Sequence, residues 1–318
     1  MSTVARPAGA GDLAGVEAVD RPPEVVRTSQ LGGLVRSMRP KQWVKNVLVF
    51  AAPGAAGVLF HPAVLLRALA AFVAFCLVAS GMYLFNDTFD ADADRSHPVK
   101  GRRAVAARAV SRRAALAFGA VLVTAGLAVG AADGWAFVAV LAGYAALSGA
   151  YTLWLKHIAV IDIAVVASCF VLRAIAGGVA TSVAISQWFL IVASFGSLFV
   201  VAGKRHGEYV DLGPRRVEAR RSLGLYPASY LRYLWMVSSA VTIGAYCLWA
   251  FEQAHLHHGF PWYELSIVPF VLGILRYALL LECGLGAAPE DVILGDTTLQ
   301  VLGVVWVAVF AAAVYLGR

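Results

Sequence analysis

The chain of 318 residues is too apolar and too poor in charge to be an ordinary water-soluble protein. Hydrophobic residues make up 60% of it and charged residues 14%, and the formal net charge is +7. Soluble domains are nearer half apolar and one-quarter charged. The apolar residues gather in runs of about twenty, the length of an α-helix that crosses roughly 30 Å of hydrocarbon. The composition therefore predicts an all-α, polytopic membrane protein.

The first thirty residues differ in composition from the rest of the chain. They are rich in Gly, Ala, Pro and charged residues and show no apolar periodicity. Such a segment buries too little apolar surface to order itself. We expect a disordered cytoplasmic tail over residues 1–30 and one transmembrane domain over residues 31–318.

Nine apolar segments follow the tail, and each predicts a transmembrane helix. They are Val44–Phe60, Val64–Phe85, Ala114–Ala132, Trp135–Leu155, Ile158–Ala180, Gln187–Gly203, Tyr230–Phe251, Leu265–Leu281 and Leu299–Leu316. Pro53 and Gly54 weaken the first segment, but neighbouring helices in a bundle tolerate such breaks.

The distribution of Lys and Arg predicts the orientation in the membrane. Seven basic residues precede or begin the first apolar segment, seven follow the second, and seven lie between Lys204 and Arg232. The opposite loops carry almost none. Because basic loops stay in the cytoplasm, we expect a multi-pass protein of the cell membrane with its N-terminus in the cytoplasm and its C-terminus outside. The positive charge thus sets orientation, and we do not expect nucleic acid as a partner.

An acidic stretch, residues 86–94 (NDTFDADAD), lies at the end of the second segment. A helix turns by about 100° per residue, so four of its polar side chains share one face: Asn86, Asp87, Asp90 and Asp94. Asp92 points away from that face. The alternative is a solvated acidic loop, but carboxylates beside a membrane are costly and are usually functional.

The chemistry of this face predicts a magnesium site. Carboxylates on one face repel one another unless a cation lies among them, and Mg²⁺ is usually shared between one or two carboxylates and the phosphates of a substrate. Lys100 and Arg103 follow shortly after and suit phosphate oxygens. We expect the Mg²⁺ ligands to be Asn86, Asp87, Asp90 and Asp94, with the three aspartates catalytic.

The pattern NDxxDxxxD over residues 86–94, in a protein with nine predicted helices, resembles the first aspartate-rich motif of the UbiA superfamily of intramembrane prenyltransferases. The resemblance extends over all nine segments. It implies a helical bundle around a central cavity that opens to the cytoplasm and laterally to lipid, where Mg²⁺ held by the aspartates binds a diphosphate and assists its departure.

The second acidic motif of ordinary family members is largely missing here. Residues 203–211 read GKRHGEYVD, which leaves Glu208 and Asp211 as acids and adds Lys204 and Arg205. With the basic run at residues 39–46, this resembles the branch that transfers 5-phosphoribose from phosphoribosyl pyrophosphate to decaprenyl (polyprenyl) phosphate, a precursor step for cell-wall arabinan.

The residues that this reading assigns to substrate binding lie at the predicted cavity mouth. They are Lys45, Asn46, Asn86, Lys100, Arg103, Tyr151, Lys156, Asp162, Lys204, Arg205 and Glu208. Each cation has an alternative role as a residue that sets orientation or binds lipid headgroups. Arg173 and Arg276 lie within predicted helices, where a charged side chain usually pairs with another polar group in a structural role.

Two other functions remain open from the sequence. One is transfer of an isoprenoid from its diphosphate to an aromatic acceptor, which predicts a second acidic motif. The other is transport of a phosphorylated lipid, which favours inverted repeats and helices broken near the middle of the membrane; only the first segment carries such a break. A homo-oligomer is compatible with the sequence.

Overall fold

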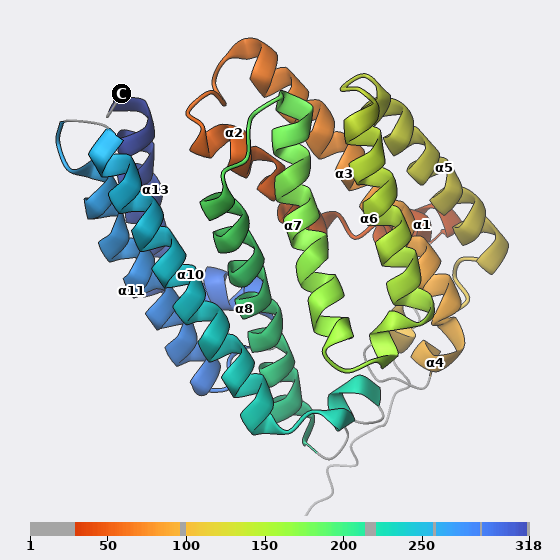
Figure 1. The fold of residues 1–318 in the computed structure, drawn as a ribbon. Coiled ribbons are helices and arrows are strands. Elements are labelled where there is room, and N and C mark those ends of the chain that lie inside the picture. Colours follow the sequence, from red (N-terminus) through yellow and green to blue (C-terminus); the bar gives the residue numbers. More distant parts are fainter. Residues whose placement is uncertain (1–28, 96–99, 214–220, 257–258, 287, 317–318) are drawn as a thin grey trace, which may run out of the picture.

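The computed structural model describes residues 29–95, 100–213, 221–256, 259–286 and 288–316. All regular elements in these ranges are helices (Figure 1), as the sequence predicts. Of the predicted tail, residues 1–28 lie outside the described residues, and Ser29 caps the first helix.

Eight of the described helices are long and apolar enough to cross a membrane. They are α3 (Pro62–Phe89), α5 (Arg112–Ala131), α6 (Trp135–Leu153), α7 (Ile161–Thr181), α8 (Gln187–Leu212), α10 (Ala228–Leu256), α11 (Trp262–Glu282) and α13 (Thr297–Leu316). Shorter elements connect or precede them. These are α1 (Gln30–Ser37), η1 (Pro40–Phe50), α2 (Ala51–Ala55), α4 (Ala91–Arg95), η2 (Lys100–Arg102), η3 (Leu155–His157), η5 (Arg221–Leu225) and α12 (Pro289–Gly295).

The first predicted segment, Val44–Phe60, is not a regular α-helix. Its residues lie in η1, a 3₁₀ run of eleven residues, and in the short helix α2. A 3₁₀ helix rises about 2.0 Å per residue, so η1 extends over roughly 22 Å. It packs closely on α7: a Cβ added to Gly177 would lie 1.8 Å from the carbonyl oxygen of Val49. Pro53 in α2 lacks a backbone N–H, so it interrupts any longer α-helix over this segment.

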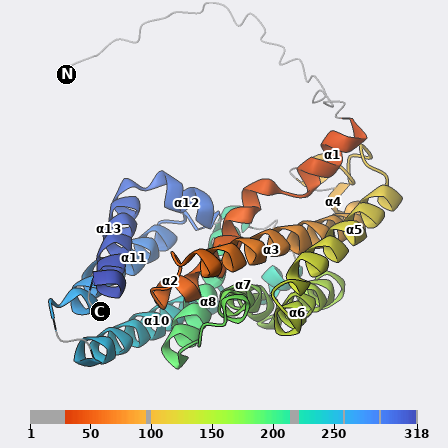
Figure 2. The same ribbon diagram turned by 90° about the horizontal axis from the view of Figure 1, so that it is seen from above.

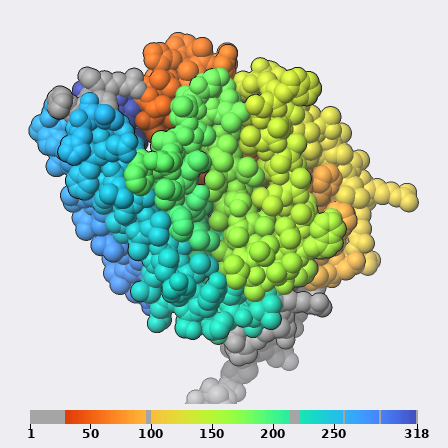
Figure 3. Space-filling model, viewed as in Figure 1, coloured from red at the N-terminus to blue at the C-terminus, as the bar shows by residue number. Residues whose placement is uncertain are grey.

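The helices form two groups that meet between α7 and α8. Helix α3 packs against α5, α6 and α7, while α8 packs against α10, and α11 against α13 (Figures 1 and 2). Side chains of α6, α7 and α10 fill most of the space between the ribbons on the face shown in Figure 3. The outer surface of α13 is apolar, with Val301, Val304 and Val307 exposed, as expected of a helix that faces lipid.

Several helices extend further than the apolar segments that predict them, and for α3 and α8 the extension bears on the site. Helix α3 ends at Phe89, and Asp90 caps it with its backbone N–H on the Asn86 carbonyl. Helix α4 then continues from Ala91, so the acidic stretch is almost continuously helical. Helix α8 runs on to Leu212 and thereby places Lys204 to Asp211 on helical turns. The polar ends of α3 and α8 carry most of the predicted site.

Candidate active site

Two arginines from distant parts of the chain bind the first aspartate of the acidic stretch. The Asp87 carboxylate is 2% exposed and lies 2.5 Å from Arg39 and 3.1 Å from Arg103. Arg103 also contacts Asp94 at 2.7 Å. Arg39 lies just before η1 and stacks on the ring of Tyr83, with its guanidinium carbon 4.9 Å from the centroid. These contacts gather two carboxylates and two guanidinium groups at the end of α3.

The other two polar residues of this face contact the end of α6 and the connection from α6 to α7. Lys156, in η3, forms an ion pair with Asp90. The Thr152 hydroxyl, near the end of α6, lies 3.3 Å from the amide oxygen of Asn86. The acidic face is therefore lined by cations and a hydroxyl from three separate segments, which is the environment that anionic oxygens need.

Asp92 points away from this group, as the helical spacing predicts. Its side chain is 70% exposed and pairs with Arg95 and Arg112 at the surface, both at 2.6 Å. The hydrogen bond and charge of Arg112 lower the pKa of Asp92 below its ordinary value. Asp92 is thus a surface carboxylate that offers a control for its buried neighbours.

A second charged group lies at the polar end of α8. Arg205 is buried and its guanidinium contacts Glu208 at 2.9 Å, Asp162 at 3.4 Å and the Tyr151 hydroxyl at 3.4 Å. The sequence placed all four residues in the substrate site, and the structure brings them together. Tyr151 precedes Thr152 in α6, so this group is adjacent to the acidic face.

Asp162 is fixed mainly by residues that the sequence analysis did not select. The Tyr226 hydroxyl donates to it at 2.6 Å and the Ser222 hydroxyl at 3.0 Å. Burial and the hydrogen bond to Asp162 raise the pKa of Tyr226 above its usual value. Tyr226 therefore remains a neutral donor, and Asp162 serves to hold α7, the η5 region and Arg205 together.

Asn46 is a buried residue of η1 that contacts α7 and α3. Arg173 donates to its amide oxygen at 2.7 Å and to the Tyr144 hydroxyl at 3.0 Å, and Asn46 donates to the Cys76 sulfur at 3.2 Å. Arg173 is 4% exposed, so its charge is held by neutral oxygens and by the Tyr144 ring. These contacts give both residues a structural role that joins η1, α6 and α7.

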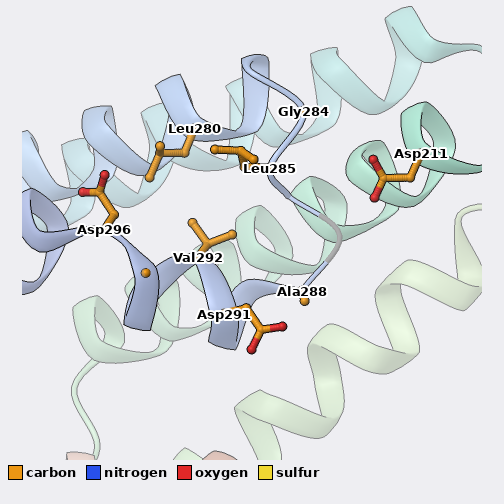
Figure 4. A pocket seen from close by; sticks show the side chains of 9 residues that line it. Asp211, Leu280, Gly284, Leu285, Ala288, Asp291, Val292 and Asp296 are labelled. Carbon is orange, nitrogen blue, oxygen red and sulfur yellow. The ribbon is translucent and has the colours of Figure 1, made fainter.

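The remaining predicted cations lie on different sides of the site. Lys100 lines a pocket of about 240 Å³ together with Arg39, Asp87 and Arg103. Lys45 and Lys204 instead lie where η1 and α8 approach α12, within electrostatic reach of Glu290. A larger pocket, of about 460 Å³, lies where the ends of α8 and α11 meet α12 (Figure 4). Its lining includes Asp211, Asp291 and Asp296, and none of its lining residues is a predicted site residue.

Arg276 does not belong to the site. Two of its nitrogens contact the Asp296 carboxylate, at 2.6 and 3.2 Å. Asp296 also accepts from the backbone N–H of Leu299 at 2.7 Å and thereby caps the N-terminus of α13.

The donor atoms of the acidic face suit Mg²⁺, although their present partners are basic side chains. Asn86, Asp87, Asp90 and Asp94 offer only oxygen ligands, which hard cations prefer. Within the described ranges, no three acidic, His or Cys side chains converge closely enough to hold a metal ion. Arg39, Arg103 and Lys156 supply the positive charge among the carboxylates instead.

Of the residues on this face, Arg39 and Thr152 were missed as site residues. Arg39 belongs to the basic run at residues 39–46, which is the sequence signal that could have found it. Its backbone φ angle is 53°, a left-handed conformation that cannot be predicted for an arginine from the sequence. No sequence feature identified Thr152 as a site residue, apart from its position four residues before Lys156.

Comparison with known proteins gives matches along nearly the whole chain. The model of the UbiA prenyltransferase family matches residues 47–292. The decaprenyl-phosphate phosphoribosyltransferase of Corynebacterium glutamicum is 44% identical over 289 residues, which cover 89% of this chain and 87% of that protein. The protein of the same name from Mycobacterium tuberculosis is 43% identical over 310 residues, or 95% and 99% of the two chains.

A solved structure shares the fold. A UbiA homolog from Archaeoglobus fulgidus, bound to DMAPP and Mg²⁺, superposes with a TM-score of 0.69 at 16% identity, over 90% of this chain and 100% of that chain. At this identity the likeness concerns the fold, and the residues that carry chemistry must be argued from their own geometry.

Proposed function

Because the chain belongs to the UbiA prenyltransferase family, we propose that it is a membrane transferase that moves 5-phosphoribose from phosphoribosyl pyrophosphate to a polyprenyl phosphate and releases diphosphate. The observation that carries this proposal is the set of relatives named decaprenyl-phosphate phosphoribosyltransferase, at 41–44% identity over most of the chain. The lipid product is a precursor for cell-wall arabinan.

The acidic face at the end of α3 is the site for the diphosphate of the donor. Asn86, Asp87, Asp90 and Asp94 would hold Mg²⁺, which neutralises a diphosphate and makes it a better leaving group. Arg39, Arg103 and Lys156 contact the same carboxylates. Their N–H groups lie where they can turn from carboxylate to phosphate oxygens, as charge-assisted donors do.

The phosphoribosyl transfer step requires little proton transfer. The bond from the anomeric carbon to the diphosphate oxygen breaks, and a phosphate oxygen of the acceptor bonds to that carbon from the opposite face. A phosphate monoester has a second pKa of about 6, so the acceptor is largely ionised near neutral pH and needs no strong general base. Two anionic substrates repel each other, however. The cations around the acidic face and beside it, including Arg205 and Lys204, serve to hold them together.

The orientation follows from the basic residues. The ends of α3 and α8 and the α6–α7 connection carry the cations, and cytoplasmic segments hold an excess of Lys and Arg. We therefore place the site on the cytoplasmic side of the cell membrane, where a soluble phosphoribosyl donor is accessible, with the N-terminus on the same side.

A transfer assay tests the proposal against isoprenoid transfer. Purified protein in detergent receives phosphoribosyl pyrophosphate labelled with ³²P in its 5-phosphate, together with polyprenyl phosphate and Mg²⁺, and label in the organic phase is counted. We expect transfer that EDTA abolishes and excess Mg²⁺ restores. Absence of this transfer, together with transfer of an isoprenoid from its diphosphate to an aromatic acid, would leave the family intact and contradict the proposed substrates.

A further inference from the structure

Helix α12 contacts the N-terminal segment η1 through a polar pair. The Gln42 side chain, in η1, donates to Glu290 at 3.3 Å across 248 residues of sequence. Figure 2 shows α12 between the α11–α13 pair and the start of η1. The acidic stretch around Glu290 has no role in the chemistry derived above, so this contact needs its own explanation.

Close packing fixes the position of Glu290. The loop before α12 passes directly over α8, because a Cβ added to Gly286 would lie 2.9 Å from the carbonyl oxygen of Gly203. Pro289 is buried at the start of α12, and Val292 packs into the cluster that contains Leu281. The start of α12, which carries Glu290, is therefore fixed close to Gly203, the residue before Lys204 in α8.

Two lysines from different elements act on the Glu290 carboxylate. Burial alone would raise its pKa, but a backbone hydrogen bond, the charges of Lys45 and Lys204 and the Gln42 hydrogen bond outweigh burial and lower the pKa below the ordinary value. The Gln42 amide thus contacts the Glu290 carboxylate directly, and the two ammonium groups act on it through their charge. This donor set suits a phosphate, which offers more charge and more acceptor oxygens than a carboxylate.

These lysines are separate from the cations of the acidic face. The carboxylates of the acidic face are already paired with Arg39, Arg103 and Lys156. Lys204 is not among these cations, and its ion pair with Glu208 is long, at 3.9 Å. A reaction that joins two phosphorylated substrates needs two such groups. The acidic face suits the donor diphosphate, which leaves the Lys45 and Lys204 group for the second substrate.

The surroundings of Glu290 favour a lipid as that second substrate. On α12 itself, Ile293 and Leu294 are exposed, the latter by 74%. The neighbouring α11 and α13 also expose apolar side chains, among them Leu279 and Val304. An apolar face beside an anion-binding group is what a phosphate on a long isoprenoid chain requires, with its head at the lysines and its chain in the membrane.

We propose that Gln42, Lys45 and Lys204 bind the phosphate of the polyprenyl phosphate acceptor, and that Glu290 occupies this site until the acceptor displaces it. This inference rests on the proposed function, whose two phosphorylated substrates it assigns to two groups of cations. In the free protein the Glu290 charge offsets the charges of the two lysines, and its carboxylate occupies the Gln42 amide. Glu290 therefore opposes the binding of an anionic acceptor.

The substitution Glu290→Gln tests the inference, with Asp291→Asn as the matched control. The control removes the next carboxylate of α12, which lines the pocket of Figure 4. We expect Glu290→Gln to lower the KM for polyprenyl phosphate roughly three- to fivefold, the size of one weak competing charge interaction, with kcat and the KM for phosphoribosyl pyrophosphate unchanged. Asp291→Asn should change none of them.

A second variant gives the opposite result if the inference holds. Lys204→Gln should raise the KM for polyprenyl phosphate and leave the KM for phosphoribosyl pyrophosphate near the wild-type value. Binding of farnesyl phosphate to the wild type and both variants, measured without donor, should follow the same order and does not depend on turnover.

Three outcomes overturn the inference while wild-type transfer still supports the proposed function. In the first, Glu290→Gln raises or does not change the acceptor KM. In the second, Glu290→Gln and Asp291→Asn behave alike. In the third, the donor KM moves instead, which would assign the lysines to the 5-phosphate of the donor. Absence of any phosphoribose transfer by the wild type would instead refute the proposed function.

Discussion

The guanidinium group of Arg39 lies 2.5 Å from the Asp87 carboxylate and joins the N-terminal segment to the end of α3. Arg39 reaches this position in a left-handed backbone conformation immediately before η1. The other end of η1 is held against α7, where Gly177 faces the Val49 backbone. The arrangement of the aspartates thus depends on how closely η1 packs on α7.

Substitution of Gly177 tests this dependence. In Gly177→Ala the new Cβ would lie 1.8 Å from the Val49 carbonyl oxygen, so η1 must shift. We expect a loss of stability of about 1–3 kcal/mol and a clear fall in transfer activity. Thermal unfolding in detergent and the transfer assay measure the two effects. Gly143→Ala is the control, because a Cβ there meets no atom within 4 Å; equal effects of the two substitutions would contradict the account.

Charge removal at the acidic face should abolish transfer, whereas the same change at the surface should not. We expect Asp90→Asn to lower kcat at least about a hundredfold, because one of the groups that stabilise the departing diphosphate is lost. Asp92→Asn should stay near the wild type, since Asp92 is 70% exposed and pairs with surface arginines. Near-normal turnover of Asp90→Asn in Mg²⁺ would exclude it as a ligand.

Arg173 should prove structural. Arg173→Met leaves Asn46 and Tyr144 without their donor, so we expect the stability to fall by about 1–3 kcal/mol. The loss of activity should match the loss of folded protein. A double-mutant cycle with Asn46→Ala should give a coupling of about 0.5–2 kcal/mol. Arg67→Met, at an exposed position of α3, is the control. Full stability with lost activity would instead indicate contact with substrate.

The Tyr226 hydroxyl should stabilise the second charged group. Tyr226→Phe removes its 2.6 Å hydrogen bond to Asp162 and leaves a buried carboxylate with one donor fewer, which we expect to cost about 1–3 kcal/mol. Because Asp162 also faces Arg205, activity should fall in parallel. Tyr233→Phe, at a ring that is 60% exposed, should be close to neutral. A neutral Tyr226→Phe would show that Asp162 does not need this donor.

The long helices and the orientation of the acidic face could be predicted from the sequence because both follow from local periodicity. Apolar runs located the eight long helices, and helical spacing separated Asp92 from Asp87 and its neighbours correctly. The ends of α3 and α8 were placed too early, since polar residues continue a helix beyond the apolar run that begins it.

Features that depend on contacts between distant segments were not accessible. The close approach of η1 to Gly177 joins residues far apart in sequence, and the position of Arg39 depends on an unusual backbone conformation. The Gln42–Glu290 pair links residues 248 positions apart. The central cavity open to lipid stays a prediction.

Identification of the lipid product is the most direct test of the central claim. Purified protein is given phosphoribosyl pyrophosphate, polyprenyl phosphate, a prenyl diphosphate, 4-hydroxybenzoate and Mg²⁺ together, and the extracted lipids are analysed by mass spectrometry. We predict one new lipid, polyprenyl phosphate with an added 5-phosphoribosyl group, which forms only with Mg²⁺. A prenylated aromatic acid in its place, or a phosphoribosylated lipid that forms equally in EDTA, would contradict the account.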